Sequence, residues 1–335
     1  MQADDTAPKP ALSIISAVHD TEPYLAEMID SVVAQTVGDW ELVIVDNGMS
    51  DEVVRIVDKY ADDVRIRLLR QQYRGLAAGV DAAAAVARGD RYAVVPGDGL
   101  LTPTFCERVA AVLAEHPEID VLCIDALPVL DGQDQPPSFR QRCGIAEEPG
   151  IGYRVGLVDV IRRSGLYTTA AIRASAWTAG GGYSGETPQV DSLAMCLRML
   201  AAGCDLRVLP EQLGRYRLYA DTPDDAPVDH EYEDSVERAF LQVADLSDDP
   251  QVLAELRSTL RKIRYERALR LSREALRNDD PTTARKQTLI ALRHRPSLRP
   301  ASLWLVLRIA PGALARLRSV KRRINGLRGR GAMTT

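Results

Sequence analysis

The chain has 335 residues, 46% hydrophobic and 27% charged, with a formal net charge of −5, and this composition excludes a wholly disordered chain. No apolar run approaches the roughly 18 residues that a membrane span needs. Five cysteines without Cys-x-x-Cys spacing and four scattered histidines argue against a zinc site, so a metal would be held by carboxylate and ligand oxygens, which suits Mg²⁺ or Mn²⁺.

The first half of the chain alternates apolar runs with helical patterns. Strand, helix, strand and helix follow one another within about fifty residues, which is typical of a doubly wound α/β fold with a mostly parallel sheet and helices on both faces. An apolar stripe at Leu25, Met28, Ile29, Val32 and Val33 identifies the first helix. The expected strands are 12–18, 40–45, 64–70, 92–95 and 121–124, and the expected helices are 21–33, 51–60, 76–88 and 103–115.

Asp46 ends the strand 40–45. Asn47-Gly48 supply a turn that tolerates positive φ, and Ser50 or Asp51 can cap the helix that follows. Because ligands of open α/β sheets lie outside the carboxyl ends of the strands, Asp46 can meet a nucleotide there. The alternative is that Asp46 only closes the strand-to-helix turn.

A second acid, Asp98, follows the strand 92–95 in the run Pro96-Gly97-Asp98-Gly99. Asp46 and Asp98 would face the same edge of a parallel sheet. Two carboxylates brought together in this way suggest a cation that bridges to an anionic ligand, most simply a nucleotide diphosphate.

Five motifs between Leu12 and Leu101 resemble, in order and spacing, those of family 2 glycosyltransferases of the GT-A fold. They are Ala17-Val18-His19-Asp20, Ser31 to Gln35, Asp46 to Asp51, Gly75 to Gly89, and Pro96 to Gly99. The resemblance implies an inverting enzyme that uses a nucleotide-sugar donor, with uridine as the family's commonest base.

Four residues match the family's nucleoside site. The resemblance implies that Asp46 contacts the base or ribose, that Ala17 and His19 lie where the first loop surrounds the nucleoside, and that Arg74 lies near its rim.

The diphosphate site departs from the family pattern. Gly97 and Asp98 match the end of the D-x-D element, and Asp98 matches the acid that ligates the divalent cation. Pro96 and Gly99 stand where the family usually has acids. We still expect Mg²⁺ or Mn²⁺, because one carboxylate, diphosphate oxygens and waters can complete the shell.

Residues 176–183 resemble the family's Gly-Gly-Phe loop, which precedes the helix that carries the general base. Asp191 is the acid in this helix and the candidate base. Counting back from Leu197-Arg198 puts Asp191 on the family's Glu position and Ser192 on the base position, so the assignment needs a shift of one residue. The alternative is that Asp191 is a helix N-cap.

The run Arg215 to Tyr219 resembles the family's Tyr-Arg-x-His loop, which closes over the diphosphate. Tyr219 replaces the His, and Arg217 could neutralise phosphate charge by a forked contact or be merely solvated.

The charges divide the chain. Residues 281–335 hold 13 Lys or Arg and no acid, whereas residues 1–280 hold 29 bases and 47 acids. We predict a flexible N-terminus without a secretory signal over 1–11, a GT-A domain over 12–222, and a helical C-terminal module with a basic amphipathic tail over 223–335. The segment 301–330 either binds an anionic membrane surface or packs on the acidic domain, and nucleic acid is not an expected partner.

These features predict an inverting, non-processive glycosyltransferase that moves one sugar to a hydroxyl of a lipid-linked or cell-surface glycan. It would be cytoplasmic, either free or peripheral on the inner face of the cytoplasmic membrane, and its oligomeric state is not predicted. The competing hypothesis is a catalytically degenerate GT-A-fold protein that acts as a nucleotide-binding or scaffolding subunit, suggested by Pro96, Gly99, Ser192 and Tyr219. A nucleotidyltransferase is disfavoured, because no Gly-rich phosphate loop follows the first strand.

Overall fold

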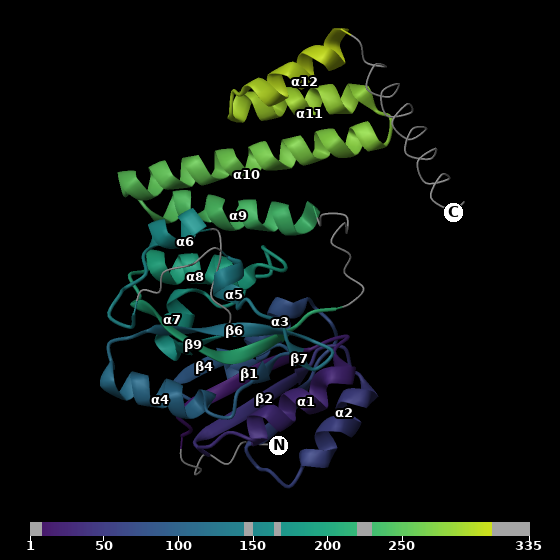
Figure 1. Ribbon diagram of the computed structural model, residues 1–335. Helices are drawn as coiled ribbons and strands as arrows, with labels where there is room; N and C mark the ends of the chain where they lie inside the picture. The colour runs from purple at the N-terminus through teal and green to yellow at the C-terminus, as the bar shows by residue number, and fades with distance from the viewer. Residues whose placement is uncertain (1–8, 144–149, 164–168, 220–229, 310–335) are drawn as a thin grey trace, which may run out of the picture. The chain divides into compact units, whose positions relative to one another are not determined.

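A computed structural model describes residues 9–143, 150–163, 169–219 and 230–309 (Figure 1). It divides into two compact units, Met1–Leu253 and Ala254–Thr335. Most of the predicted flexible N-terminus and the part of the predicted tail from residue 310 onward lie outside the described residues. The predicted boundary after residue 222 also falls outside them and stays a prediction.

One sheet organises the first unit. Its strand order is β3-β2-β1-β4-β8-β6-β9-β5, with β7 paired to β6. Parallel pairing joins β1 to β2 and β4, β2 to β3, and β6 to β9, whereas β8 runs antiparallel to β4 and β6. The strands are β1 (Leu12–Val18), β2 (Trp40–Asp46), β3 (Ile66–Arg70), β4 (Arg91–Val94), β5 (Leu100–Leu101), β6 (Val121–Leu130), β7 (Gln133–Asp134), β8 (Ala170–Arg173) and β9 (Leu206–Arg217).

Helices cover both faces of this sheet, as predicted for a doubly wound GT-A fold. Figure 1 shows α1 and α2 on one side of the sheet and α8 and α9 on the other. The helices of the unit are α1 (Glu22–Val33), α2 (Asp51–Val57), the 3₁₀ helix η1 (Asp58–Tyr60), α3 (Leu76–Val86), α4 (Phe105–Glu115), α5 (Phe139–Arg142), α6 (Leu157–Arg163), α7 (Ala174–Ala179), α8 (Asp191–Ala201) and α9 (His230–Leu246).

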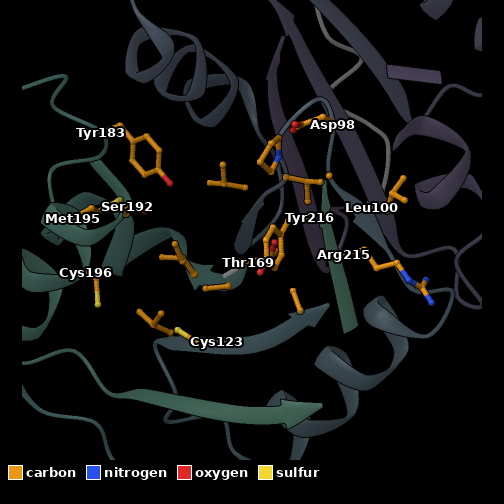
Figure 2. A pocket seen from close by; sticks show the side chains of 18 of the residues that line it. Asp98, Leu100, Cys123, Thr169, Tyr183, Ser192, Met195, Cys196, Arg215 and Tyr216 are labelled. Carbon is orange, nitrogen blue, oxygen red and sulfur yellow. The ribbon is translucent and has the colours of Figure 1, made fainter. Parts of the chain in front are cut away.

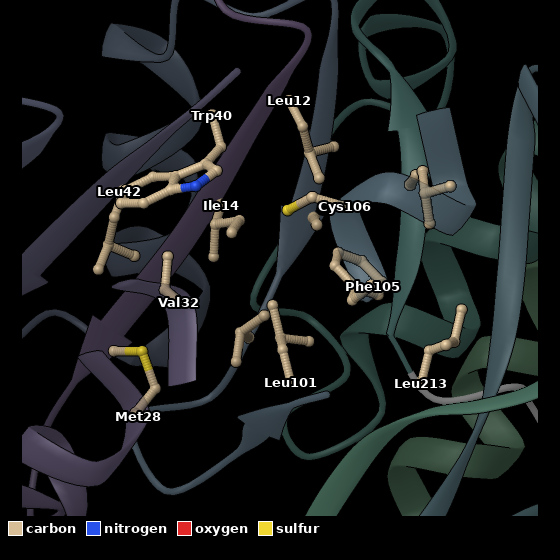
Figure 3. Close-up of a cluster of buried hydrophobic side chains, with 14 of the residues drawn as sticks. Leu12, Ile14, Met28, Val32, Trp40, Leu42, Leu101, Phe105, Cys106 and Leu213 are labelled. Carbon is tan, nitrogen blue, oxygen red and sulfur yellow. The ribbon is translucent and has the colours of Figure 1, made fainter. Parts of the chain in front are cut away.

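The main hydrophobic core lies between the sheet and the helices α1, α2 and α4. Figure 3 shows side chains of β1 and β2 meeting those of α1 and α4. Fully burying one such Leu, Ile or Met side chain stabilises the fold by roughly 1.5–3 kcal/mol. The side chains labelled there include Leu12, Ile14, Met28, Val32, Leu42, Phe105 and Cys106, all less than 10% exposed.

Several predicted details are wrong. Val33 is 41% exposed and ends α1, so it does not belong to the buried stripe. Val64 is 86% exposed and precedes β3. The positive φ of the turn after β2 belongs to Met49, at 58°, rather than to Asn47-Gly48. Ser50 is the N-cap of α2, but its side chain makes no capping hydrogen bond.

The second unit is helical. It contains most of α10 (Pro250–Arg277), followed by α11 (Pro281–His294) and α12 (Leu298–Ile309). Asp280 caps α11, because its side chain accepts hydrogen bonds from the backbone of Thr282 and Thr283 at 3.1 and 3.0 Å. Among the described residues, no helix is long and apolar enough to cross a membrane.

Glu41 of β2 is a buried carboxylate on the face of the sheet opposite to Leu42. It accepts hydrogen bonds from Ser13 Oγ at 2.6 Å and Arg88 Nε at 3.0 Å, and it pairs with Arg67 at 3.2 Å. Burial acts to raise the pKa of Glu41, but the hydrogen bonds from Ser13 and Arg88 outweigh it, so the pKa lies below its ordinary value.

Glu41→Gln is therefore expected to lower the free energy of unfolding by about 3 kcal/mol at pH 7, because it removes the charge of a buried carboxylate that accepts hydrogen bonds from Ser13 and from two partly exposed arginines. A carboxylate with a lowered pKa contributes its stability above about pH 4.3, the unfolded value, and loses it as the pH falls through the folded pKa. Urea unfolding at pH 7 and at pH 3 should show the difference from the wild type shrinking at acid pH. Glu107→Gln, at an exposed carboxylate, is the control.

Candidate functional site

Two acids lie at one edge of the sheet, on either side of β1. Val18 of β1 is paired with Asp46 in the parallel neighbour β2, and Ile15 is paired with Val94 at the end of the parallel neighbour β4. Asp98 follows β4 after a short turn. The carboxyl ends of parallel strands meet at one edge, so Asp46 and Asp98 share the edge at which ligands of such sheets bind.

Asp46 is fully buried and engaged on both oxygens. Its Oδ2 accepts from Arg70 Nε at 2.9 Å, and its Oδ1 accepts from the Ser50 backbone N–H at 3.0 Å. The carboxylate thus closes the turn into α2, while each oxygen retains a lone pair that could accept from a ligand. Arg70, which sequence reasoning missed, is paired with Asp46 in the β2–β3 register.

The three other residues predicted around the nucleoside lie in different surroundings. His19 lies after β1, and its ring stacks on Tyr73 with centroids 4.1 Å apart and an interplanar angle of 21°. Ala17 was expected in the loop, but it lies inside β1 and is buried, and a Cβ on Gly79 would come within 2.7 Å of its Cβ. Arg74 is exposed, with Nη2 3.4 Å from Gln71 Oε1.

Asp98 is held by the segment that follows β9. The Tyr219 hydroxyl donates to Asp98 Oδ2, and burial together with this carboxylate raises the pKa of Tyr219. The Tyr219 ring packs edge-on against Tyr24, at 5.9 Å. The Arg217 guanidinium lies 4.2 Å from the centre of the Tyr24 ring and donates to Glu27 at 2.8 Å. Asp98 and Arg217 are thus linked through two tyrosines.

Position 97, next to Asp98, has no room for a side chain, because a Cβ there would lie 2.4 Å from Thr21 Oγ1.

A metal site at Asp98 has few protein ligands. Within the described residues, no three His, Cys, Asp or Glu side chains gather to hold an ion. The neighbours Pro96 and Gly99 offer no side-chain oxygen. This donor set fits Mg²⁺ or Mn²⁺ if the ligand's phosphate oxygens and water complete the shell.

A pocket of about 310 Å³ extends from Asp98 between the sheet and α8 (Figure 2). Asp98 lies at one end, whereas Tyr183, Ser192 and Met195 line the α8 side. Strands β4, β8, β6 and β9 supply the other wall. The side chains labelled in Figure 2 also include Leu100, Cys123, Thr169, Cys196, Arg215 and Tyr216.

Asp191 is the first residue of α8, and Val190 is the N-cap, so the N-cap alternative for Asp191 is wrong. The Asp191 carboxylate is buried and accepts from Thr187 Oγ1 at 3.0 Å. Burial raises its pKa, although hydrogen bonds from Thr187 and the Gly185 backbone act against the rise. Exposed Ser192 lines the pocket, whereas Asp191 is not among the described residues that line it.

A second acid, Asp81 of α3, holds the loop before α8 and was missed by sequence reasoning. It accepts from the Tyr183 backbone N–H at 2.9 Å. Burial raises its pKa, and the nearby Asp191 adds to the rise. Arg198 of α8 holds the same loop by donating to the carbonyl oxygens of Gly180 and Gly182 at 2.5 and 2.6 Å. The sequence signal for Asp81 was that it is the single acid in an otherwise apolar helix.

Comparison with known proteins finds a family match in the N-terminal part of the chain. Residues 13–166 match the model of glycosyl transferase family 2. The putative glycosyltransferase EpsH of Bacillus subtilis is 30% identical over 115 residues, which is 34% of this chain and 33% of EpsH. The uncharacterized glycosyltransferase EpsJ of the same organism is 32% identical over 114 residues, with the same coverage. The chain thus spans about a third of the length of these relatives.

Solved structures share the fold over nearly all of the chain. A crystal structure of S. aureus TarS 1–349 in complex with UDP-GlcNAc superposes with a TM-score of 0.61 and 16% identity, covering 94% of this chain and 91% of the other. The mannosyltransferase PcManGT from Pyrobaculum calidifontis, in complex with GDP-Man and Mn²⁺, gives a TM-score of 0.56 and 16% identity, covering 92% and 83%.

Proposed function

We propose that this chain, whose residues 13–166 belong to glycosyl transferase family 2, moves a single sugar, with inversion, from a nucleotide-sugar donor to a hydroxyl of a lipid-linked or cell-surface glycan. The observation that carries the proposal is the position of Asp46 and Asp98 at one sheet edge, on either side of β1. Structures named with UDP-GlcNAc or GDP-Man support a nucleoside diphosphate donor, and we favour UDP.

In this proposal the nucleoside binds over Asp46 and the stacked His19–Tyr73 pair, and the diphosphate lies at Asp98. A bound Mg²⁺ or Mn²⁺ would neutralise charge that develops on the departing diphosphate. Arg217 is linked to Asp98 through Tyr24 and Tyr219, and it adds positive charge to this side of the site.

The transfer itself is an in-line displacement. The acceptor oxygen attacks the anomeric carbon from the face opposite to the diphosphate, and the new C–O bond forms as the bond to the phosphate oxygen breaks. The bonding electrons leave with the nucleoside diphosphate, and the acceptor proton passes to Asp191. Its buried carboxylate has a raised pKa, which makes it a stronger base than an exposed aspartate.

The second candidate, a nucleotide-binding subunit without turnover, is favoured by one observation. Ser192, rather than Asp191, lines the pocket. Calorimetry with UDP and GDP, with and without Mn²⁺, followed by turnover assays with a panel of sugar nucleotides, separates the two. Tight binding without metal dependence or turnover supports the binding subunit, and no binding of any nucleotide contradicts both.

Asp46→Asn is expected to weaken nucleoside diphosphate binding about tenfold or more, because a hydrogen bond to a charged group contributes about 1.5–3 kcal/mol. Titration calorimetry measures the effect. Asp51→Asn is the matched control, because the exposed Asp51 carboxylate pairs with the same Arg70 at 3.2 Å. Equal affinities of the two variants would show that Asp46 only closes its turn.

We also propose that α12 contacts an anionic membrane surface. Four apolar side chains on it are exposed, Leu298, Leu305, Val306 and Ile309. A groove between α11 and α12 is lined by Arg285, Lys286, Trp304 and Arg308, among others, which suits anionic head groups.

Replacing Leu305 and Ile309 together by Glu should reduce sedimentation of the full chain with phosphatidylserine vesicles by about tenfold, because each change removes apolar burial and adds repulsion. Leu241→Glu, at an apolar residue of α9 that is 41% exposed, is the control. Equal sedimentation of all three proteins would contradict the membrane contact.

A further inference from the structure

The pocket beside Asp98 has two halves of different chemistry. Its more exposed lining residues, here called the mouth, carry the polar groups of Asp98, Thr169, Tyr183, Ser192, Tyr216 and Arg217. Its interior is formed by apolar side chains that are each less than 10% exposed. These are Val121, Cys123, Ile172, Met195, Met199 and Leu206. Burial raises the pKa values of the Cys123 and Cys196 thiols, so both stay neutral and behave as small apolar groups.

The order of the strands places this interior relative to the donor. The strands run β2-β1-β4-β8-β6 across the sheet. The proposed nucleoside contact, Asp46, ends β2, and the proposed diphosphate contact, Asp98, follows β4. The pocket continues from Asp98 to residues of β8 and β6, which lie on the other side of β4 from β2. Its interior therefore lies beyond the diphosphate, on the side where sugar and acceptor must meet.

Size and lining define the chemical class of the occupant. An apolar cavity of about 150 Å³ holds benzene, and the whole pocket, mouth included, has a volume of about 310 Å³, so its inner half has room for an apolar group of about that size. A sugar placed among the six interior side chains would bury hydroxyls that those side chains cannot pair, which costs free energy for each unpaired group. An alkyl, prenyl or aryl group meets no such penalty.

We propose that the inner half of this pocket binds an apolar aglycone of the acceptor, so that the acceptor is a hydroxyl compound carrying an alkyl, prenyl or aryl group rather than a purely polar glycan. This inference rests on the proposed glycosyl transfer and narrows its acceptor. The acceptor hydroxyl then lies at the mouth near Ser192, on the side of the donor sugar away from the diphosphate, while the apolar group fills the interior between β6, β8 and α8.

Binding of n-alkanols from butanol to decanol to the full chain tests the proposal. Each alkanol carries one hydroxyl and a tail of defined length. The fluorescence of Trp177 reports alkanol binding in the pocket, because its ring stacks on the lining residue Tyr183 with centroids 5.6 Å apart and an interplanar angle of 17°. Affinity is expected to increase about fourfold per added methylene until the pocket is full, from the transfer free energy of a CH₂ group.

Two variants place bulk inside the pocket, Ala170→Leu on β8 and Cys196→Phe on α8. Each is expected to weaken octanol binding at least tenfold and to keep or raise the melting temperature, because it fills a cavity. Using both protects the test against misfolding of one. Ala110→Phe, on the exposed face of α4, is the matched control and should bind octanol and UDP as the wild type does.

Absence of alkanol binding in a wild-type protein that binds UDP would overturn this inference and leave the proposed transfer standing. Binding without chain-length dependence, or with wild-type affinity in both folded filling variants, would overturn it as well. A wild-type protein that fails to bind UDP would instead contradict the proposed transfer.

Discussion

Asp98→Ala is expected to reduce sugar transfer by about 100- to 1000-fold and to remove the Mn²⁺ dependence of nucleoside diphosphate binding. Asp98 is the carboxylate that we propose at the diphosphate position, and its neighbours Pro96 and Gly99 offer no side-chain oxygen in its place. Groups that stabilise charge developing on a leaving diphosphate act mainly in the transition state, so their loss lowers kcat more than it raises KM. Steady-state kinetics and Mn²⁺ titrations of UDP binding measure the two effects.

Tyr219→Phe is the matched control for Asp98→Ala. It keeps the Asp98 carboxylate and removes the hydroxyl that donates to Oδ2. A carboxylate freed from that donor should bind Mn²⁺ at least as tightly as in the wild type. If Asp98→Ala retains metal-dependent binding, Asp98 does not hold the ion, and the metal site must be sought elsewhere in the chain.

The edge of the sheet was predictable because it follows from local patterns. The apolar runs before Asp46 and Asp98 define two strands, and parallel strands with helical crossovers bring their carboxyl ends to one side. Strand ends were less predictable. β6 continues to Leu130, well past the expected end at residue 124, because its pairing with β9 extends it through residues with no continuous apolar run.

Contacts between distant segments account for what the sequence did not reveal. Asp81 and Tyr183 meet because α3 and the loop before α8 pack together, although 102 positions separate them. Asp98 and Tyr219 meet across 121 positions. No periodicity encodes such pairs, so Asp81 could be noticed only as an acid in an alanine-rich helix, and the Tyr219–Asp98 contact required the structure.

Asp191→Asn is expected to lower kcat/KM for transfer by about 10²- to 10⁴-fold, the range for removal of a general base, with donor affinity unchanged. A base acts in its deprotonated form, so activity should rise with pH through the pKa of Asp191. Because burial raises that pKa, the acid limb of the wild-type profile should lie above the ordinary aspartate value of about 3.9. The Asn variant should lose this limb, which the pH dependence of kcat/KM measures.

Thr187→Val distinguishes catalysis by Asp191 from a purely structural role. The Thr187 hydroxyl donates to Asp191 at 3.0 Å and lowers its pKa, so its removal should raise that pKa further and move the acid limb to higher pH. A merely structural contact would change stability and leave the position of the limb unchanged. Ser192→Ala is expected to keep the limb. If instead Ser192→Ala is as inactive as Asp191→Asn, and Asp191→Asn retains the acid limb, the proton of the acceptor goes to another group that lines the pocket.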